Sequence, residues 1–522
     1  MNPAITHSRG DAALSKIADD GRVSRSSRYL NGVCWTLVTN IAGSGFAFLA
    51  AILLARILDP TGYGRYRTIT YLVGFCAAVA GFELRDAMRR FIPTCKVEGT
   101  GGIAAAVLAA CAVVGGFSIL IAAGLMVFAS RIAEGAYKEP SLAGMLRWSG
   151  ILVTATAAAA LMEAALSGLE LYKVATTRSL IAQAMALPLQ LLLAWRFGVM
   201  GAIWGFGILL GSRAALMGFA VAGACSASSW NAVGIRDVIA MARRLMGFSL
   251  PLLITALLMP FANWWLSATL ARTSGIVEVG IFAVAYALVQ LVTTIMLAAG
   301  VPLMPVLAEA STSEDPRTLA RIVSRGAVTI LLLLFIPAFV LGANAHAVIL
   351  ILYGRHYAAA APVLFQFALA CVPLSICESL NRSSIATGHV RLVVGGHLVW
   401  LSTIVAAVEF YGRFHGAVGC AQSFLAAELI QSIYLVCIFH LYLRFEMHGI
   451  AKMFAICSAA MVPAYFLSSV TTAWSLAAFL ATSLAVFSAL WHWSLGEADR
   501  AIVSGWLNGI GMRLSFPRTR QV

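Results

Sequence analysis

Charged residues inside long apolar runs are the residues of this sequence that could do chemistry. Arg213 and Glu428 each fall near the middle of such a run. A charge at the centre of a bilayer costs about 2.5–3.5 kcal/mol on insertion scales, so it is expected to serve a function. An internal offset of 215 residues superposes the two positions. They could meet as a structural ion pair that locks two helices, or they could contact a substrate or a coupling ion.

Two further carboxylates, Glu163 and Glu378, lie toward the ends of apolar runs. They are candidates for coupling transport to H⁺ or Na⁺; the alternative is an interfacial charge at a helix end. Arg382 follows Glu378 by one helical turn, which favours a local salt bridge. Arg85 and Arg89 belong to a dense charge cluster. This cluster is either a cationic vestibule for a phosphate-bearing headgroup, which arginine binds in a bidentate way, or a positive-inside anchor.

Asn40 and Asn263 are uncharged polar residues within apolar runs, and they complete the candidate binding set. Motifs for catalysis are missing from the sequence. There is no Gly-Lys-Ser/Thr of a P-loop and no HExxH. The ten cysteines are scattered without a CxxC. We therefore expect no enzyme activity, no bound metal and no cofactor.

The composition is that of a membrane protein. Of 522 residues, 61% are hydrophobic and only 11% are charged, whereas soluble domains have about 25% charged residues. The net charge of +14 is spread singly between apolar runs, which excludes a nucleic-acid-binding surface. Runs of about 20 apolar residues predict an all-α polytopic fold with about fourteen transmembrane helices. The predicted spans are 31–55, 67–91, 103–129, 145–167, 178–196, 200–223, 247–271, 280–306, 326–350, 360–381, 391–410, 417–443, 451–470 and 473–493.

An internal repeat organises these spans. Residues 53–73 recur at 269–289, an offset of 216 that places Gly64 on Gly280. The repeat predicts two six-helix bundles related by a pseudo-two-fold axis, with two C-terminal helices outside them. Most Lys and Arg residues lie in alternate loops together with both termini, which predicts that both termini are cytoplasmic. The expected parts are a tail (1–28), an N-lobe (29–229), an amphipathic linker (230–246), a C-lobe (247–444), two further helices (445–495) and a second tail (496–522).

The recurring stretch also resembles a known family. It contains Ala55-Arg56-x-Leu58-x-Pro60-x-x-Tyr63-Gly64-x-Tyr66, and its echoes are Ser249-x-Pro251, Val279-Gly280-x-Phe282 and Tyr353-Gly354. These residues resemble the polysaccharide-transport branch of the multidrug/oligosaccharidyl-lipid/polysaccharide (MOP) exporter superfamily. That branch includes the O-antigen and exopolysaccharide repeat-unit flippases (Wzx-like). The resemblance implies a MATE-like fold.

The resemblance further implies a transporter of undecaprenyl-diphosphate-linked oligosaccharide in the bacterial inner membrane. It would work by alternating access, without a cofactor, driven by an H⁺, Na⁺ or substrate gradient. Membrane lipids, a polysaccharide polymerase and chain-length proteins are the partners it implies. Lipid II flippases, which the expected fold resembles, carry arginines in the first spans. Here the first span holds only Asn40 as a strong polar group, which argues against that role. The alternative is a cation-coupled multidrug exporter, which Glu163 and Glu378 would suit and Arg213 would not. A scaffold or a membrane synthase is a third interpretation.

Overall fold

The structure is a computed structural model that describes residues 6–98, 100–224, 230, 233–300, 316–443 and 448–468. Within these ranges the regular structure is entirely helical. Nine of the described helices are long and apolar enough to cross a membrane, and the bent pair α10–α11 adds a tenth candidate. The predicted all-α polytopic membrane fold is confirmed. The predicted span 473–493 lies outside the described residues, so the total of fourteen stays a prediction.

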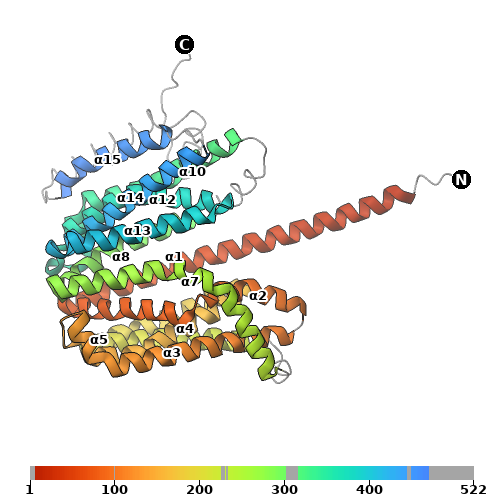
Figure 1. Cartoon of the computed structure of the whole chain (residues 1–522), viewed down its shortest axis with the longest axis horizontal. Helices are drawn as coiled ribbons and strands as arrows, with labels where there is room; N and C mark the ends of the chain where they lie inside the picture. Colours follow the sequence, from red (N-terminus) through yellow and green to blue (C-terminus); the bar gives the residue numbers. More distant parts are fainter. Residues whose placement is uncertain are drawn as a thin grey trace, which may run out of the picture. The chain divides into compact units, whose positions relative to one another are not determined.

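The helices are numbered in chain order, which the colours of Figure 1 follow from red to blue. They are α1 (Thr6–Gly81), α2 (Leu84–Glu98), α3 (Thr100–Ala136), α4 (Leu142–Gly168), α5 (Tyr172–Ala224), α7 (Ile235–Ser274), α8 (Ile276–Gly300), α10 (Pro316–Ala343), α11 (Ala345–Tyr353), α12 (Ala360–Ala386), α13 (Val390–Phe410), α14 (Gly416–Leu443) and α15 (His448–Ser468). Short 3₁₀ turns at Arg355–Tyr357 and Gly412–Phe414 precede α12 and α14.

The chain forms two compact units, which are described separately. Unit 1 comprises Met1–Val301 and Leu401–Ser423, and unit 2 comprises Pro302–Trp400 and Phe424–Val522. In unit 1, α1 packs on α4, α5, α7 and α8, and α3 packs on α4. In unit 2, α10, α12 and α15 pack on one another.

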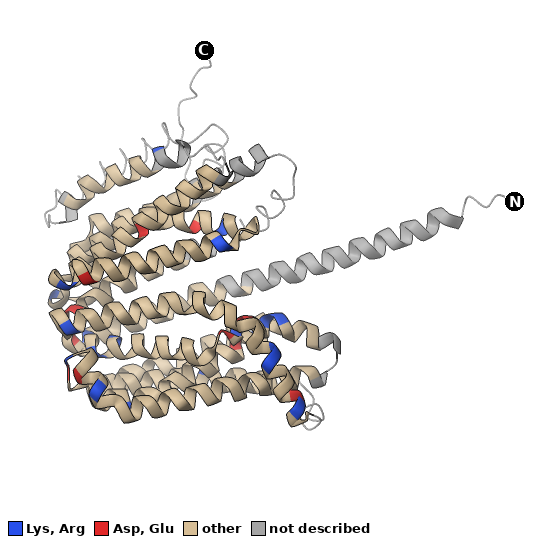
Figure 2. Ribbon diagram, in the orientation of Figure 1, with Lys and Arg blue, Asp and Glu red and all other residues tan. Residues whose placement is uncertain are grey.

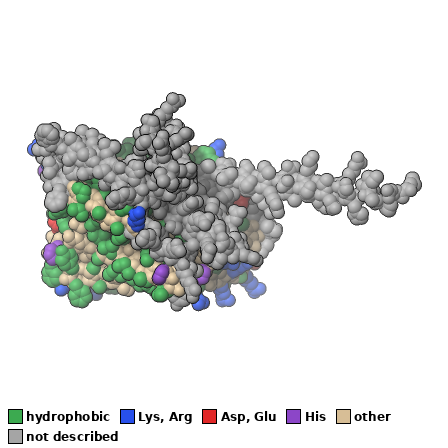
Figure 3. Space-filling view, turned by 90° about the horizontal axis from the view of Figure 1, so that it is seen from above, with side chains coloured by type: hydrophobic (Ala, Val, Ile, Leu, Met, Phe, Trp, Pro, Cys, Tyr) green, Lys and Arg blue, Asp and Glu red, His purple; other side chains and the backbone are tan. Residues whose placement is uncertain are grey.

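The described surface is apolar, as a lipid-facing protein requires. Hydrophobic side chains cover most of the described surface in view in Figure 3, and charged residues gather mainly near helix ends (Figure 2). Large side chains such as Val127, Met185 and Phe219 are more than two-thirds exposed on spanning helices. In water such contiguous apolar exposure would drive aggregation. A bilayer solvates it instead.

The second span differs from its predicted bounds of 67–91. Asp59 takes φ 58° and ψ 170°, and Pro60 then starts a new helical segment within α1. Proline suits a first helical position because its missing N–H would have no intrahelical partner there. This segment ends at Gly81, because Phe82 and Glu83 adopt positive φ. The polar stretch expected as a turn is therefore helical, and the charge cluster after it forms a separate helix, α2.

The repeat is visible in the backbone. Left-handed residues break the helices at equivalent places in the two halves: Asp59 and Gly275, Lys138 and Gly354, Glu170 and Gly388, and Gly198 and Gly416. The first two pairs are 216 positions apart, and the last two are 218 apart. The helices α4 and α12 both have 27 residues and start at 142 and 360, which is also 218 apart. The offset of 215 is therefore wrong for the later helices. Arg213 is equivalent to Gln431 rather than Glu428, and Glu163 is equivalent to Asn381 rather than Glu378.

The two repeat glycines touch where α1 crosses α8. A Cβ on Gly64 would overlap the carbonyl oxygen of Ile276, and a Cβ on Gly280 would overlap that of Pro60. Each of these carbonyls lies one helical turn before the opposite glycine, so the contact is reciprocal. Reciprocal contacts of this kind are what a two-fold axis produces. The crossing therefore supports the predicted pseudo-symmetry of spans 1–2 and 7–8.

Replacing Gly64 by alanine tests this crossing. A Cβ there has to displace the backbone of α8, and overpacking costs about 1–3 kcal/mol. We expect G64A to lower the Tm of the detergent-solubilised protein. The matched control is G74A on the same helix, where a Cβ meets no atom within 4 Å. Equal Tm values for G64A and G74A would contradict the close crossing.

Candidate functional site

Arg213 and Glu163 form an ion pair inside unit 1. Arg213 lies on the second half of α5, and its Nη2 is 2.5 Å from Oε2 of Glu163 on α4. The side chains are 27% and 29% exposed, so the pair is mostly shielded but still reachable. The partner of Arg213 in this structure is therefore Glu163. The alternative of a pair with Glu428 was suggested by the offset of 215, which does not hold for these helices.

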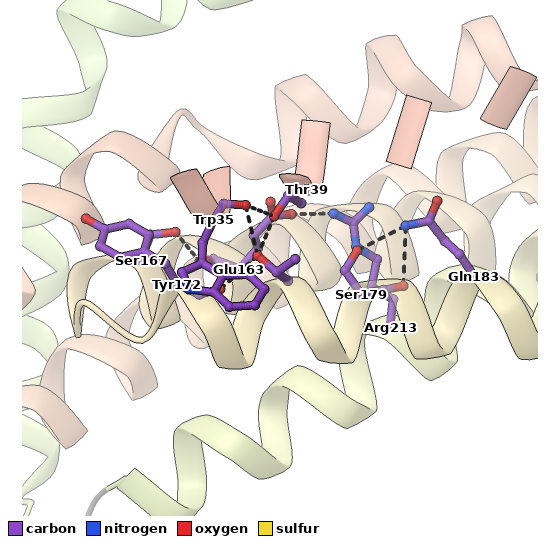
Figure 4. Close-up of polar contacts among 9 residues, drawn as sticks. Trp35, Thr39, Glu163, Ser167, Tyr172, Ser179, Gln183 and Arg213 are labelled. Carbon is purple, nitrogen blue, oxygen red and sulfur yellow. Dashed lines mark hydrogen bonds and ion pairs between the residues drawn. The ribbon is translucent and has the colours of Figure 1, made fainter. Parts of the chain in front are cut away.

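Uncharged polar groups lie around this pair and form, with it, what we call the polar row (Figure 4). The hydroxyl groups of Thr39 on α1 and Thr176 on α5 are 2.5 Å apart. Gln183 donates through Nε2 to the hydroxyl of Ser179, at 3.2 Å. The remaining members of the polar row are Trp35, Glu163, Ser167, Tyr172 and Arg213. Hydroxyl and amide groups at membrane depth can hydrogen-bond a polar ligand in place of water.

Arg85 and Arg89 both lie on α2, and each is paired locally. Arg85 lies 3.3 Å from Glu83, and Arg89 lies 3.1 Å from Asp86, which precedes it by three residues on the same helix. Both arginine side chains are 51% exposed. Glu83 and Arg85 line a cavity of about 180 Å³ whose other walls are mainly small residues of α1 and α4. Arg89 does not line it.

The two asparagines are not brought together with the ion pair. Asn40 is exposed on α1, and Asn263 is half-buried on α7. Asn263 hydrogen-bonds with the hydroxyl of Tyr286 on α8, as does Gln290. The sequence analysis expected both asparagines to lie within membrane spans. Their part in substrate binding remains a proposal.

Unit 2 holds the other two predicted carboxylates. Glu378 pairs with Arg382 at 3.6 Å, which confirms the predicted salt bridge. Glu428 is only 2% exposed, and its Oε1 accepts a hydrogen bond of 2.9 Å from Nε1 of Trp400. Its Oε2 is buried and has no hydrogen-bond partner among the described residues. Of the three carboxylates Glu163, Glu378 and Glu428, the last is therefore the one without a cationic partner in the described part of the chain.

Arg67 is a candidate that the sequence analysis did not select, because it stands at the predicted start of the second span, next to a polar stretch. The structure places it inside the second helical segment of α1. Its Nη2 donates to the hydroxyl of Tyr71 at 2.9 Å, and it lines a cavity of about 140 Å³. Tyr63, Arg67 and Tyr71 are spaced by four residues, which places them on one helical face. That spacing was the available signal.

A family comparison agrees with this architecture. Residues 29–311, more than half of the chain, match the model of a family described as "Polysaccharide biosynthesis protein". The chain belongs to this family. This match confirms the resemblance drawn from the sequence. A comparison with curated proteins found no match.

Solved structures of transporters share the fold. The lipid II flippase MurJ in an inward closed conformation aligns at a TM-score of 0.65 and 15% identity, over 92% of this chain and 100% of MurJ. An inward-facing multidrug resistance MATE family transporter of the MOP superfamily aligns at 0.55 and 13%, over 81% and 96%. A point mutant of the Vibrio cholerae MATE transporter VcmN aligns at 0.52 and 16%, over 83% and 99%. At these identities the likeness shows the fold alone, which is that of MOP-superfamily transporters.

The Arg213–Glu163 pair generates a stability prediction. In E163Q the arginine charge stays at membrane depth without its partner. We expect a cost between the roughly 1 kcal/mol of exposed pairs and the about 3–5 kcal/mol of buried ones, seen as a lower Tm. The double variant E163Q/R213Q removes both charges and should recover most of the loss. An E163Q protein as stable as the wild type would mean that the pair contributes nothing.

Proposed function

We propose that this protein is an inner-membrane flippase for undecaprenyl-diphosphate-linked oligosaccharide repeat units. It would serve the synthesis of O-antigen or exopolysaccharide and work by alternating access between the N-lobe and the C-lobe. The observation that carries the proposal is the polar row around Arg213, held by helices that are long and apolar enough to cross a membrane, in a member of a polysaccharide biosynthesis family. The fold shared with a lipid II flippase supports a lipid-linked substrate.

The chemistry of the polar row suits such a substrate. Sugar hydroxyls both donate and accept hydrogen bonds, as the threonine, serine and glutamine side chains of the row do. A diphosphate needs cations, and arginine binds phosphate with two parallel hydrogen bonds. The pair with Glu163 holds the guanidinium of Arg213 in place when no substrate is bound. A diphosphate would compete with that single carboxylate, so the arginine can be released to the substrate.

Further parts of the proposal concern location and partners. We place the protein in the bacterial inner membrane with both termini in the cytoplasm. Arg85 and Arg89 then lie at the cytoplasmic entrance, where they would attract the anionic headgroup. Asn40 and Asn263 would line its path. The polysaccharide polymerase and chain-length proteins would act on the product after translocation.

A cation-coupled multidrug exporter is the second candidate, and Glu428 is the observation that favours it. A buried carboxyl group without a cationic partner can bind H⁺ or Na⁺. Glu163 and Glu378, the coupling residues expected from the sequence, are instead paired with arginines. Coupling through Glu428 also suits a flippase, so this carboxyl group does not decide between the two functions.

Replacing Arg213 tests the flippase directly. In a strain that depends on this protein for polysaccharide export, we expect R213Q to reduce surface polysaccharide at least about tenfold at an unchanged protein level. The control is R196Q, because Arg196 is an exposed arginine of the same helix. Normal export by R213Q would remove the polar row from the mechanism. A gain of drug sensitivity without a polysaccharide defect would favour the exporter.

Replacing Glu428 tests the coupling. In proteoliposomes, an imposed H⁺ or Na⁺ gradient should accelerate transport by the wild type, and E428Q should transport at the same rate with and without the gradient. The control E409Q changes a carboxylate that pairs with Arg413 and is about one-third exposed. Retained gradient stimulation in E428Q would show that coupling lies elsewhere.

A further inference from the structure

Arg67 is a positively charged residue in the membrane-spanning part of α1. Among the described residues, no carboxylate pairs with it. Its guanidinium carbon lies 4.5 Å above the ring of Tyr71, and its one side-chain hydrogen bond in the described part of the chain goes to the hydroxyl of that tyrosine. The Nε is buried and has no acceptor there. A guanidinium has five N–H donors. Burying a charge is costly unless the charge is paired, so this arrangement calls for an anion.

The cavity beside Arg67 is lined in a way that suits an anion. It lies between α1 and α5 and measures about 140 Å³, well above the roughly 10–15 Å³ that one water needs. None of the residues that line it is acidic. Besides Arg67, its polar lining residues are Tyr63, Tyr66, Gln183 and Gln190. The amide hydrogens of both glutamines are already donated within the protein, those of Gln183 to Ser179 and those of Gln190 to Tyr66 and Ala202. Gln190 donates to the hydroxyl of Tyr66 at 3.2 Å, which leaves the hydrogen of that hydroxyl for a ligand.

The repeat shows that the fold does not require these polar residues. The apolar equivalents of Tyr63, Tyr66 and Arg67, 216 positions later, are Val279, Phe282 and Ala283. The equivalents of Gln183 and Gln190, 218 positions later, are Leu401 and Val408. The same framework is therefore built in the second half with aliphatic and aromatic packing. The polar set in the first half serves a purpose other than packing.

We propose that Arg67 and this cavity form a binding site for a phosphate-type oxyanion within unit 1. The guanidinium provides the charge and several N–H donors, and the hydroxyl of Tyr66 beside it can donate a further hydrogen bond to such an oxyanion. The anion is either the diphosphate of the lipid-linked substrate, which rests on the proposed function, or free phosphate or pyrophosphate. Both sources share the chemistry of the site, and transport assays separate them.

The binding test uses the purified full-length protein in detergent. Because a ligand that binds only the folded state stabilises it, inorganic pyrophosphate should raise the Tm of the wild type above that in NaCl of equal ionic strength. R67Q should lose this shift. The variant removes an unpaired charge, so its Tm without ligand should equal or exceed that of the wild type. R67K, which keeps the charge without the planar fork, should retain a smaller shift.

The matched control is R65Q. Arg65 lies two residues away on the same helix and pairs with Glu139 at 3.0 Å. R65Q should keep the full pyrophosphate shift. An absent shift in the wild type, or equal shifts in the wild type and R67Q, would overturn the proposal.

Export assays then identify the source of the anion. Loss of the pyrophosphate shift together with an at least tenfold loss of export in R67Q assigns the site to the substrate diphosphate. Loss of the shift with normal export assigns it to a free anion. A third outcome is that R67Q and R213Q both export normally while pyrophosphate still raises the Tm of the wild type. This outcome would overturn the proposed path of the substrate, and the anion site would remain.

Discussion

The close crossing of α1 and α8 at Gly64 and Gly280 is the contact on which the arrangement of unit 1 depends. Side chains at either position would force the two backbones apart. Because α1 also packs on α4, α5 and α7, the crossing fixes the helix that carries Arg67 and part of the polar row. The reciprocity of the contact also supports the predicted pseudo-symmetry of spans 1–2 and 7–8. Differences between equivalent positions can therefore be attributed to function.

Those differences are mainly in charge. The ion pair of Glu163 and Arg213 has an amide pair, Asn381 and Gln431, at the equivalent positions of the second half. In that half the buried Oδ1 of Asn381 and Nε2 of Gln431 have no hydrogen-bond partner among the described residues. The first half thus holds the arginines suited to a diphosphate, and the second half holds Glu428, a carboxyl group suited to a small cation. A gradient-driven flippase needs both functions, and the proposed mechanism divides them between the halves.

Much of this was predictable from sequence, because apolar runs and glycine echoes reflect physical constraints that act locally. Thirteen of the predicted spans correspond to described helices, and the offset of 216 was right for the first helices of each half. The pairing of Arg213 was not predictable, because a difference of two residues between Gly354 and Gly388 shifts all later equivalences. Arg67 was missed because it stands at the predicted start of the second span, beside a polar stretch that resembles a loop. In the structure the turn is made at Asp59, and Arg67 lies well inside the helical segment that follows.

Transfer of a labelled headgroup by the purified protein tests the central claim most directly. Liposomes containing undecaprenyl-diphosphate-linked oligosaccharide would be assayed with an impermeant reagent that modifies only sugars on the outer leaflet. We predict that the protein makes the inner-leaflet sugars accessible, whereas R213Q and protein-free liposomes do not. Unchanged accessibility with the wild-type protein, together with transport of a cationic drug by the same preparation, would contradict this prediction.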